Sequence, residues 1–147
     1  MIMGDLQDGA IAFDNRTVGL VDRYLSELNP NVVVTHYPQK SGTGHQDHDA
    51  LASAVVAAVR RSQTVRTLLY AEPPTQAWDF TPDIFVDITD HFEAKRQAVE
   101  LHASEKGKAY MLLDPLETRA KWWSFQAYVE GYENKRFEAF QLVKMTW

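Results

Sequence analysis

The residues best suited to chemistry are two histidines three positions apart with a carboxylate between them. His45, Asp47 and His48 follow a glycine-containing stretch and precede an apolar segment of helical periodicity. Residues at positions i and i+3 share one face of a helix. Neutral imidazole is the commonest metal ligand, and an adjacent carboxylate can fix which ring nitrogen is free to bind. The spacing is also compatible with polar residues that cap or solvate a helix, and it does not separate zinc from manganese or iron.

The segments around this cluster have the patterns of an α/β protein. Residues 31–36 form a short β-branched run typical of a buried parallel strand, and apolar residues recur at helical spacing over 18–28 and 50–59. A glycine-containing loop over 38–44 therefore lies at the carboxyl end of a strand, where ligands bind in such folds. We expect a Rossmann-like layered fold with a mainly parallel sheet flanked by helices, in a single domain over residues 1–147.

Weaker patterns complete the expected fold. Further strands are predicted over 65–70, 84–88 and 137–143. Residues 116–132 and 89–104 are predicted to be helical. In the latter helix Asp90, with Glu93 three residues later, fits a capping box.

Composition excludes several classes of function. The net charge is −5 with acidic and basic residues interspersed, so a clustered basic face for nucleic acid is not expected. No apolar run approaches the length of a membrane span, and the N-terminus lacks the pattern of a signal peptide, which predicts a cytoplasmic protein without a membrane partner. Cysteine is absent, so any metal must be held by histidines and carboxylates.

The order of several motifs carries a family resemblance. Residues 30–36, a glycine-containing loop and then residues 44–48 resemble the second motif of the LmbE-like, or PIG-L, family of zinc-dependent N-acetylglucosaminyl de-N-acetylases. Residues 85–89 with Lys95, and residues 138–140, are similar to later parts of the same family. The resemblance covers about the C-terminal two-thirds of the family's fold, over a span of about 110 residues here.

The resemblance implies a role for each residue of the cluster. His48 corresponds to a ligand of the catalytic zinc, and His45 to a residue beside the substrate carbonyl that donates a proton or a hydrogen bond. Asp47 is expected to orient a neighbouring group. Bound zinc lowers the pKa of its water to about 7, so that hydroxide can attack an acetamide. The implied reaction is removal of the acetyl group from an N-acetylglucosamine-type conjugate.

Two further residues are candidates for contact with the substrate. His36 closes the strand that points toward the cluster, although a hydrogen-bonded histidine at a strand end is an equally reasonable interpretation. Thr43 stands where some family members carry a tyrosine that assists the oxyanion. Both are predicted only as substrate-binding residues.

The sequence also departs from the family. No His-Pro-Asp-Asp motif is found in these 147 residues, although that motif supplies the family's other metal ligands and its general base. We therefore expect a sheet that lacks the family's first strands, a zinc site completed by another chain or a missing N-terminal segment, and a homo-oligomer or partner fragment that covers an exposed sheet edge. The alternative function is a non-catalytic remnant or interaction domain that keeps the fold without the metal.

Overall fold

The computed structural model describes residues 4–39, 44–75, 77 and 79–146. Four strands form an open sheet in the order β1-β2-β4-β3, which confirms the predicted α/β class. The helices are α1 (Asn15–Leu28), α2 (Gln46–Val59), α3 (Phe92–Glu100) and α4 (Leu113–Gln126). The strands are β1 (Val32–His36), β2 (Thr67–Ala71), β3 (Ile84–Asp87) and β4 (Phe137–Met145), and the short 3-10 turns are η1 (Thr89–His91), η2 (Ala103–Glu105), η3 (Ala109–Met111) and η4 (Tyr132–Asn134).

The chain divides into two compact units, of which the first is built from two separate stretches. Unit 1 comprises Met1–Thr81 with Gln141–Trp147, and unit 2 comprises Pro82–Phe140. The single domain expected over residues 1–147 stays a prediction.

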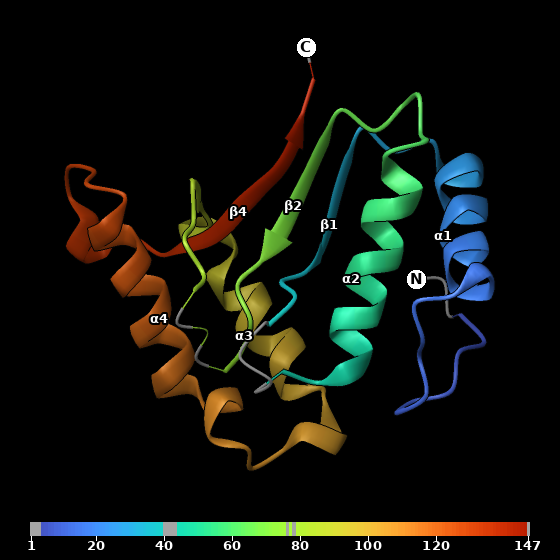
Figure 1. Cartoon of the computed structure of the whole chain (residues 1–147). Coiled ribbons are helices and arrows are strands. Elements are labelled where there is room, and N and C mark those ends of the chain that lie inside the picture. The colour runs from blue at the N-terminus through green and yellow to red at the C-terminus, as the bar shows by residue number, and fades with distance from the viewer. Residues whose placement is uncertain (1–3, 40–43, 76, 78, 147) are drawn as a thin grey trace. The chain divides into compact units, whose positions relative to one another are not determined.

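In unit 1 two helices stand beside a parallel pair of strands. Asp14 caps α1 by accepting the Thr17 amide at 2.8 Å. β1 and β2 pair in parallel, with Val32 opposite Thr67. Figure 1 shows α1 and α2 side by side, with α2 next to β1. The buried core consists of Val55, Val59, Val65 and Leu68, and the partly buried Val21, Leu25, Val33, Leu51 and Val56 pack against it.

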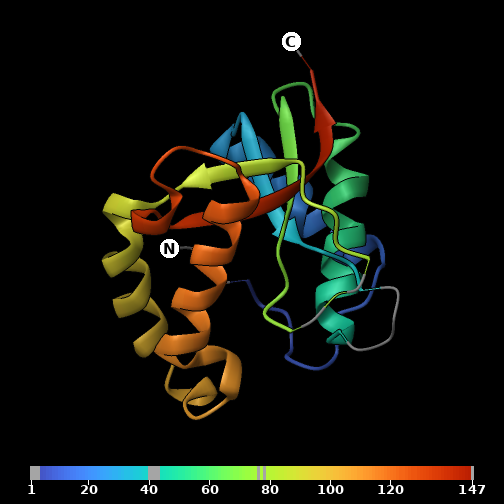
Figure 2. The same cartoon turned by 90° about the vertical axis from the view of Figure 1, so that its left-hand side faces the viewer.

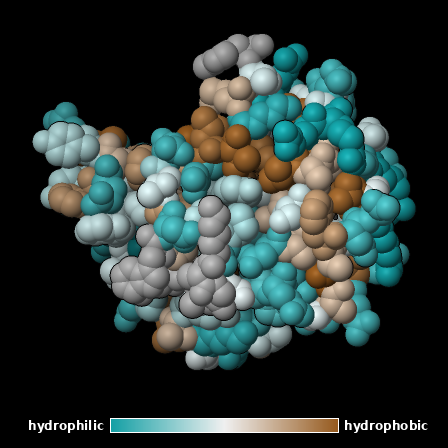
Figure 3. Space-filling model, viewed as in Figure 1, coloured by the Kyte–Doolittle hydropathy of each residue, from teal (hydrophilic) through white to brown (hydrophobic). Residues whose placement is uncertain are grey.

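The side chains of β1 alternate between this core and the surface. Val33 packs against the core and Thr35 is buried. The alternate residues Val32 and Val34 are 55% and 51% exposed. A band of hydrophobic residues is visible over the upper ends of the strands in Figure 3. One face of β1 is therefore apolar and open to solvent.

Unit 2 holds the antiparallel part of the sheet and two helices. β3 pairs with the first half of β4, with Ile84 opposite Phe140, and Figure 2 shows the two strands running alongside each other. The predicted capping box of Asp90 and Glu93 is wrong, because α3 begins later, at Phe92, with no side-chain cap.

The turn after β3 is closed by side chains other than those of the predicted capping box. The Asp87 carboxylate accepts both the amide and the hydroxyl of Thr89, at 3.0 and 2.6 Å. This closes the turn, which continues as η1. Glu93 instead binds Arg96 and Gln97.

The aromatic-rich helix of unit 2 is displaced toward the N-terminus relative to the prediction over 116–132. α4 ends at Gln126, and soon afterwards Tyr128 takes a left-handed backbone conformation with a φ of 54°. A residue in that conformation cannot continue a right-handed helix. Across the described parts of the chain, every helix is too short or too polar to cross a membrane.

Candidate functional site

The predicted cluster lies at the start of α2, where His45 is the N-cap residue. Its backbone is extended, and its Nδ1 atom accepts the Asp47 amide at 3.3 Å. An accepting Nδ1 means that neutral His45 carries its proton on Nε2. The ring is exposed. The cap therefore fixes both the position of His45 and the nitrogen that can donate a hydrogen bond.

Asp47 is buried, with 5% of its surface exposed, and its carboxylate holds the N-terminal segment against α2. One oxygen accepts the Gly9 amide at 2.6 Å and the other accepts the Ile11 amide at 3.1 Å. Gln46 adds a hydrogen bond to the Gly9 carbonyl. The group that the Asp47 carboxylate orients in this structure is thus the backbone of residues 9–11.

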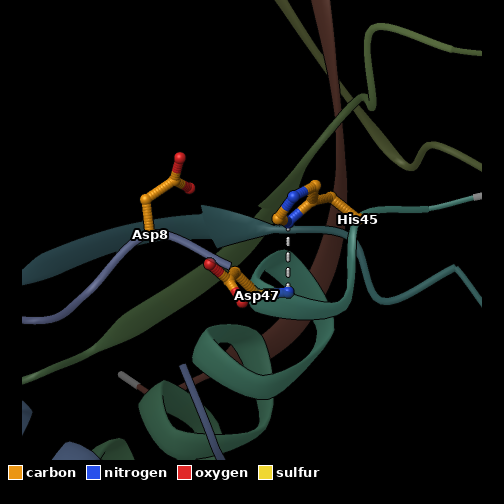
Figure 4. Close-up of side chains that lie close together, drawn as sticks. All are labelled: Asp8, His45 and Asp47. Carbon is orange, nitrogen blue, oxygen red and sulfur yellow. Dashed lines mark hydrogen bonds between the residues drawn. The ribbon is translucent and has the colours of Figure 1, made fainter. Parts of the chain in front are cut away.

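This clamp brings an unpredicted carboxylate to the cluster. Asp8, His45 and Asp47 each offer a ligand atom, and these atoms lie within 4.8 Å of one another. Figure 4 shows the loop that carries Asp8 facing the first turn of α2. The sequence contains an Asp8-Gly9 turn signal, but nothing in it indicates that this turn meets a helix almost forty residues later. The three residues form a group that could hold a metal ion.

The structure also brings the three predicted histidines together. The His36 and His48 rings are stacked, with centroids 4.0 Å apart and planes 4° from parallel. The His45 ring lies 5.5 Å from that of His48, tilted by 45°. Partial burial lowers the pKa of His36, and the charge on His48 lowers it further. Thr43 lies outside the described residues.

The loop between β1 and α2 is closed by a tight contact. Gln39 is buried, and its backbone amide donates to the Asp49 carboxylate at 2.9 Å. A Cβ atom on Gly44 would lie 2.7 Å from Gln39 Oε1 and 2.9 Å from Gln39 Cβ. Only glycine fits this position without a shift of Gln39. Gly44 therefore lets the loop pass close to Gln39 just before His45.

The hydrogen bonds of the described residues decide how well they suit a zinc ion. The Nδ1 atom of His45 is already an acceptor, so zinc binding through Nε2 would move the proton to Nδ1, where it would face the Asp47 amide. The rings of His36 and His48 lie in parallel planes, so a single ion cannot lie in both planes. As hydrogen-bonded here, these donors do not form a complete zinc site.

Comparison with known proteins supports a family resemblance for the segment that carries the cluster. Residues 1–59, which include the whole cluster, match the model of the PIG-L family, described as GlcNAc-PI de-N-acetylase. A probable N-acetyl-alpha-D-glucosaminyl L-malate deacetylase 2 of Bacillus cereus is 30% identical over 89 residues, which cover 58% of this chain and 40% of that protein. The resemblance to the PIG-L, or LmbE-like, family that the sequence predicted is confirmed over residues 1–59, about two-fifths of this chain.

Three solved structures share the fold at 18% identity. N,N'-diacetylchitobiose deacetylase from Pyrococcus horikoshii has a TM-score of 0.73, over 95% of this chain and 55% of that one. A conserved protein of Thermus thermophilus also has a TM-score of 0.73, over 97% and 65%. A 4-carboxy-2-hydroxymuconate hydratase from Pseudomonas putida has 0.68, over 91% and 60%. This chain therefore spans about two-fifths to two-thirds of each relative, and the fold alone does not set the reaction.

Proposed function

We propose that the chain acts in the removal of the acetyl group from an N-acetylated amino-sugar conjugate, with zinc as the cofactor. The family match supports the reaction class, since both the family description and the Bacillus cereus relative's name refer to deacetylation of N-acetylglucosamine compounds. The observation that carries the proposal is the exposed His45 ring, which is held by its helix cap 5.5 Å from His48. Two imidazoles at that separation can reach one small molecule.

The chain's own residues take distinct parts in this proposal. His45 donates a hydrogen bond from Nε2 to the acetamide carbonyl oxygen, and one such donor to a developing oxyanion is typically worth about 10² to 10³ in rate. Asp47 keeps the first turn of α2 in place. His36 and Thr43 are assigned to the substrate, and His48 to the metal. The remaining zinc ligands would come from a second chain or from a segment outside this sequence.

The role of His45 can be tested by release of acetate from an N-acetylglucosaminyl conjugate in the presence of zinc. The His45→Ala variant should lose at least about a hundredfold in kcat/KM. His91→Ala is the matched control, because His91 is exposed in unit 2 and should leave the rate unchanged. A His45→Ala variant that works at the wild-type rate would remove His45 from the mechanism.

A non-catalytic domain that keeps the fold is the second candidate function. Its specific support is that His45 Nδ1 and both Asp47 oxygens already serve the structure as hydrogen-bond acceptors. Mass spectrometry of the purified chain separates the two candidates. Zinc near one ion per chain, lost in His48→Ala, supports the enzyme. A chain that takes up no zinc under any loading condition supports the second candidate.

Self-association is proposed as well, because Val32 and Val34 expose an apolar face on a strand at the edge of the sheet. Val34→Lys should shift the sedimentation coefficient toward that of a monomer, because a charge on an apolar contact face opposes its burial. A wild-type chain that sediments as a monomer at all concentrations would contradict this proposal. The cytoplasmic location stays a prediction from the sequence.

A further inference from the structure

An open hollow of about 340 Å³ lies at the loop that follows α4 in unit 2, and aromatic and acidic residues make up most of its lining. Its lining includes Phe125, Tyr128 and Tyr132, together with Glu130 and Glu133. We name these five residues the aromatic–acidic pocket. The three aromatic residues are 46%, 94% and 41% exposed, in that order, although aromatic side chains normally supply core area.

The walls of this pocket are held in place by contacts of their own. The rings of Phe125 and Tyr132 meet edge to face, with centroids 5.4 Å apart. The fully buried Ser124 donates its hydroxyl to the Tyr132 carbonyl at 2.8 Å, which ties the loop to α4. Tyr128 occupies the left-handed backbone conformation. Strain of that kind in a bulky residue persists only where the surroundings impose it, and it is commonest at functional sites.

The charges of the pocket distinguish it from the rest of unit 2. Five glutamates of this unit pair with a basic side chain: Glu93 and Glu100 with Arg96, Glu105 with Lys108, Glu117 with Arg136 and Lys121, and Glu138 with Lys95. Among the described residues, no ion pair involves Glu130 or Glu133, and both side chains are exposed. The unpaired negative charge of unit 2's glutamates is thus concentrated at the aromatic hollow.

We propose that the aromatic–acidic pocket binds an organic ammonium ion. The faces of aromatic rings attract cations within about 6 Å of the ring centroid, and the two carboxylates add a field of the same sign. The apolar rings can contact the carbon atoms that carry the ammonium group. An anion would be repelled, and a neutral ligand would leave the negative charge of both carboxylates without a counter-charge, since the Asn134 amide that donates to Glu133 at 3.4 Å is itself neutral. The volume is near the lower end of the range for small-molecule sites, about 300 to 1,000 Å³, which suits a single ammonium-bearing group.

Choline and its uncharged isostere 3,3-dimethyl-1-butanol test the charge requirement, because they have nearly the same shape. Titration of the labelled chain should shift the backbone amide resonances of residues 125–134 with millimolar choline. The uncharged alcohol should bind more weakly by about fivefold or more. Equal affinity for the two probes, or no shift with millimolar choline, would overturn the proposal.

Two variants remove the two components of the pocket separately. The double variant Glu130→Gln and Glu133→Gln should reduce choline affinity to that of the alcohol, and Tyr128→Ala should weaken choline by about threefold. Asp114→Asn is the matched control, since this exposed carboxylate lies at the opposite end of α4, about 18 Å away along the helix axis. All these side chains are exposed, so folding should be preserved. An unchanged choline affinity in the double variant would also contradict the proposal.

Two further probes distinguish the possible sources of the ammonium group, a small amino sugar or a protein. Glucosamine represents a free amine, and N-acetyl-lysine amide represents the side chain of a protein partner. Tighter binding of glucosamine than of the lysine derivative indicates a small amino sugar. Tighter binding of the lysine derivative than of glucosamine indicates a protein. Because the pocket lies in unit 2 and the histidine cluster in unit 1, the proposal does not depend on the deacetylase reaction.

Discussion

The start of α2 and the loop after α4 are both rich in groups that could do chemistry, but they use these groups differently. At the start of α2 the polar groups are satisfied internally, since Asp47 accepts two amides and His45 accepts a third. In the aromatic–acidic pocket, Glu130 and Glu133 are exposed, no ion pair is found for them in the described chain, and Glu133 accepts a long hydrogen bond of 3.4 Å from the Asn134 side chain. The comparison teaches that residue type and spacing indicate a capacity, whereas hydrogen-bond partners decide how much of it is available to a ligand.

Substitution of Asp47 should give the largest effect. Asp47→Ala leaves the amides of Gly9 and Ile11 without their acceptor and should lower the free energy of unfolding by about 3 kcal/mol. Urea denaturation followed by circular dichroism measures the loss. Asp8→Ala is the control, since the exposed Asp8 should change stability by less than about 0.5 kcal/mol. Similar losses in the two variants would end the distinction between a satisfied and an available carboxylate.

Gly44 tests how tightly the loop before α2 is packed. Gly44→Ala places a methyl group 2.9 Å from Gln39 Cβ and should cost about 2 kcal/mol by overpacking. Gly19→Ala is the matched control. Nothing lies within 4 Å of a Cβ at position 19, inside α1, so alanine should stabilise the chain there by about 0.5 to 1 kcal/mol. If both substitutions have the same sign, the close contact at Gly44 is not what limits the loop.

Tyr37 is a third polar side chain of unit 1 that has a hydrogen-bond partner within the protein. Burial raises its pKa to about 12, with help from its hydrogen bond to the Asp79 carbonyl at 2.9 Å. The folded pKa lies above the ordinary value of 10.0, so the neutral phenol stabilises the fold below pH 10, and this contribution is lost as the pH rises from 10 toward 12.

Tyr37→Phe removes the group that titrates. We expect a loss of about 1 kcal/mol at neutral pH and a smaller further loss than wild type above pH 10. Unfolding curves at neutral pH and above pH 10 give the loss at each pH. Tyr128→Phe serves as the control, because Tyr128 is 94% exposed and should leave the alkaline slope as it is. A wild-type slope in Tyr37→Phe would show that another group is responsible.

The smallest expected effect is at Tyr128, and its sign is opposite. Tyr128→Gly relieves the left-handed conformation, and we expect a net gain of about 0.5 kcal/mol after the greater backbone freedom of glycine is counted. The same variant should bind choline more weakly. Thermal unfolding and the choline titration together test whether the pocket gives up stability for binding. A destabilised variant would show that Tyr128 contributes packing instead.

Much of the fold follows from local patterns in the sequence. The apolar spacing that predicted helices over 18–28 and 50–59 reflects side chains such as Leu25 and Val59, which do pack in one core. The end of α4 was not predictable in the same way. The stretch from Ala127 to Glu130 contains neither glycine nor proline, so the left-handed Tyr128 carries no sequence signal for a helix end.

The candidate site was predicted only where its residues are close in the sequence. His45, Asp47 and His48 are neighbours in the sequence, so their proximity follows from one helical turn, and the approach of His36 follows from a strand that ends at the same loop. The position of Asp8 depends on two amides that find the Asp47 carboxylate from 36 and 38 residues away. Contacts between distant residues of this kind have no local pattern in a single sequence. The catalytic and metal-binding roles of the cluster remain predictions.

The discontinuity of unit 1 has a consequence for the order in which the protein is made. Lys144 donates to the Val65 carbonyl at 3.0 Å, and the Thr146 amide donates to the Arg66 carbonyl at 2.9 Å. These contacts join the segment between α2 and β2 to residues about 80 positions later. The ribosome synthesises the end of β4 only after all of unit 2. Until then α1, α2, β1 and β2 lack the strand segment that completes unit 1. The nascent chain is therefore most prone to aggregation while unit 2 is being synthesised.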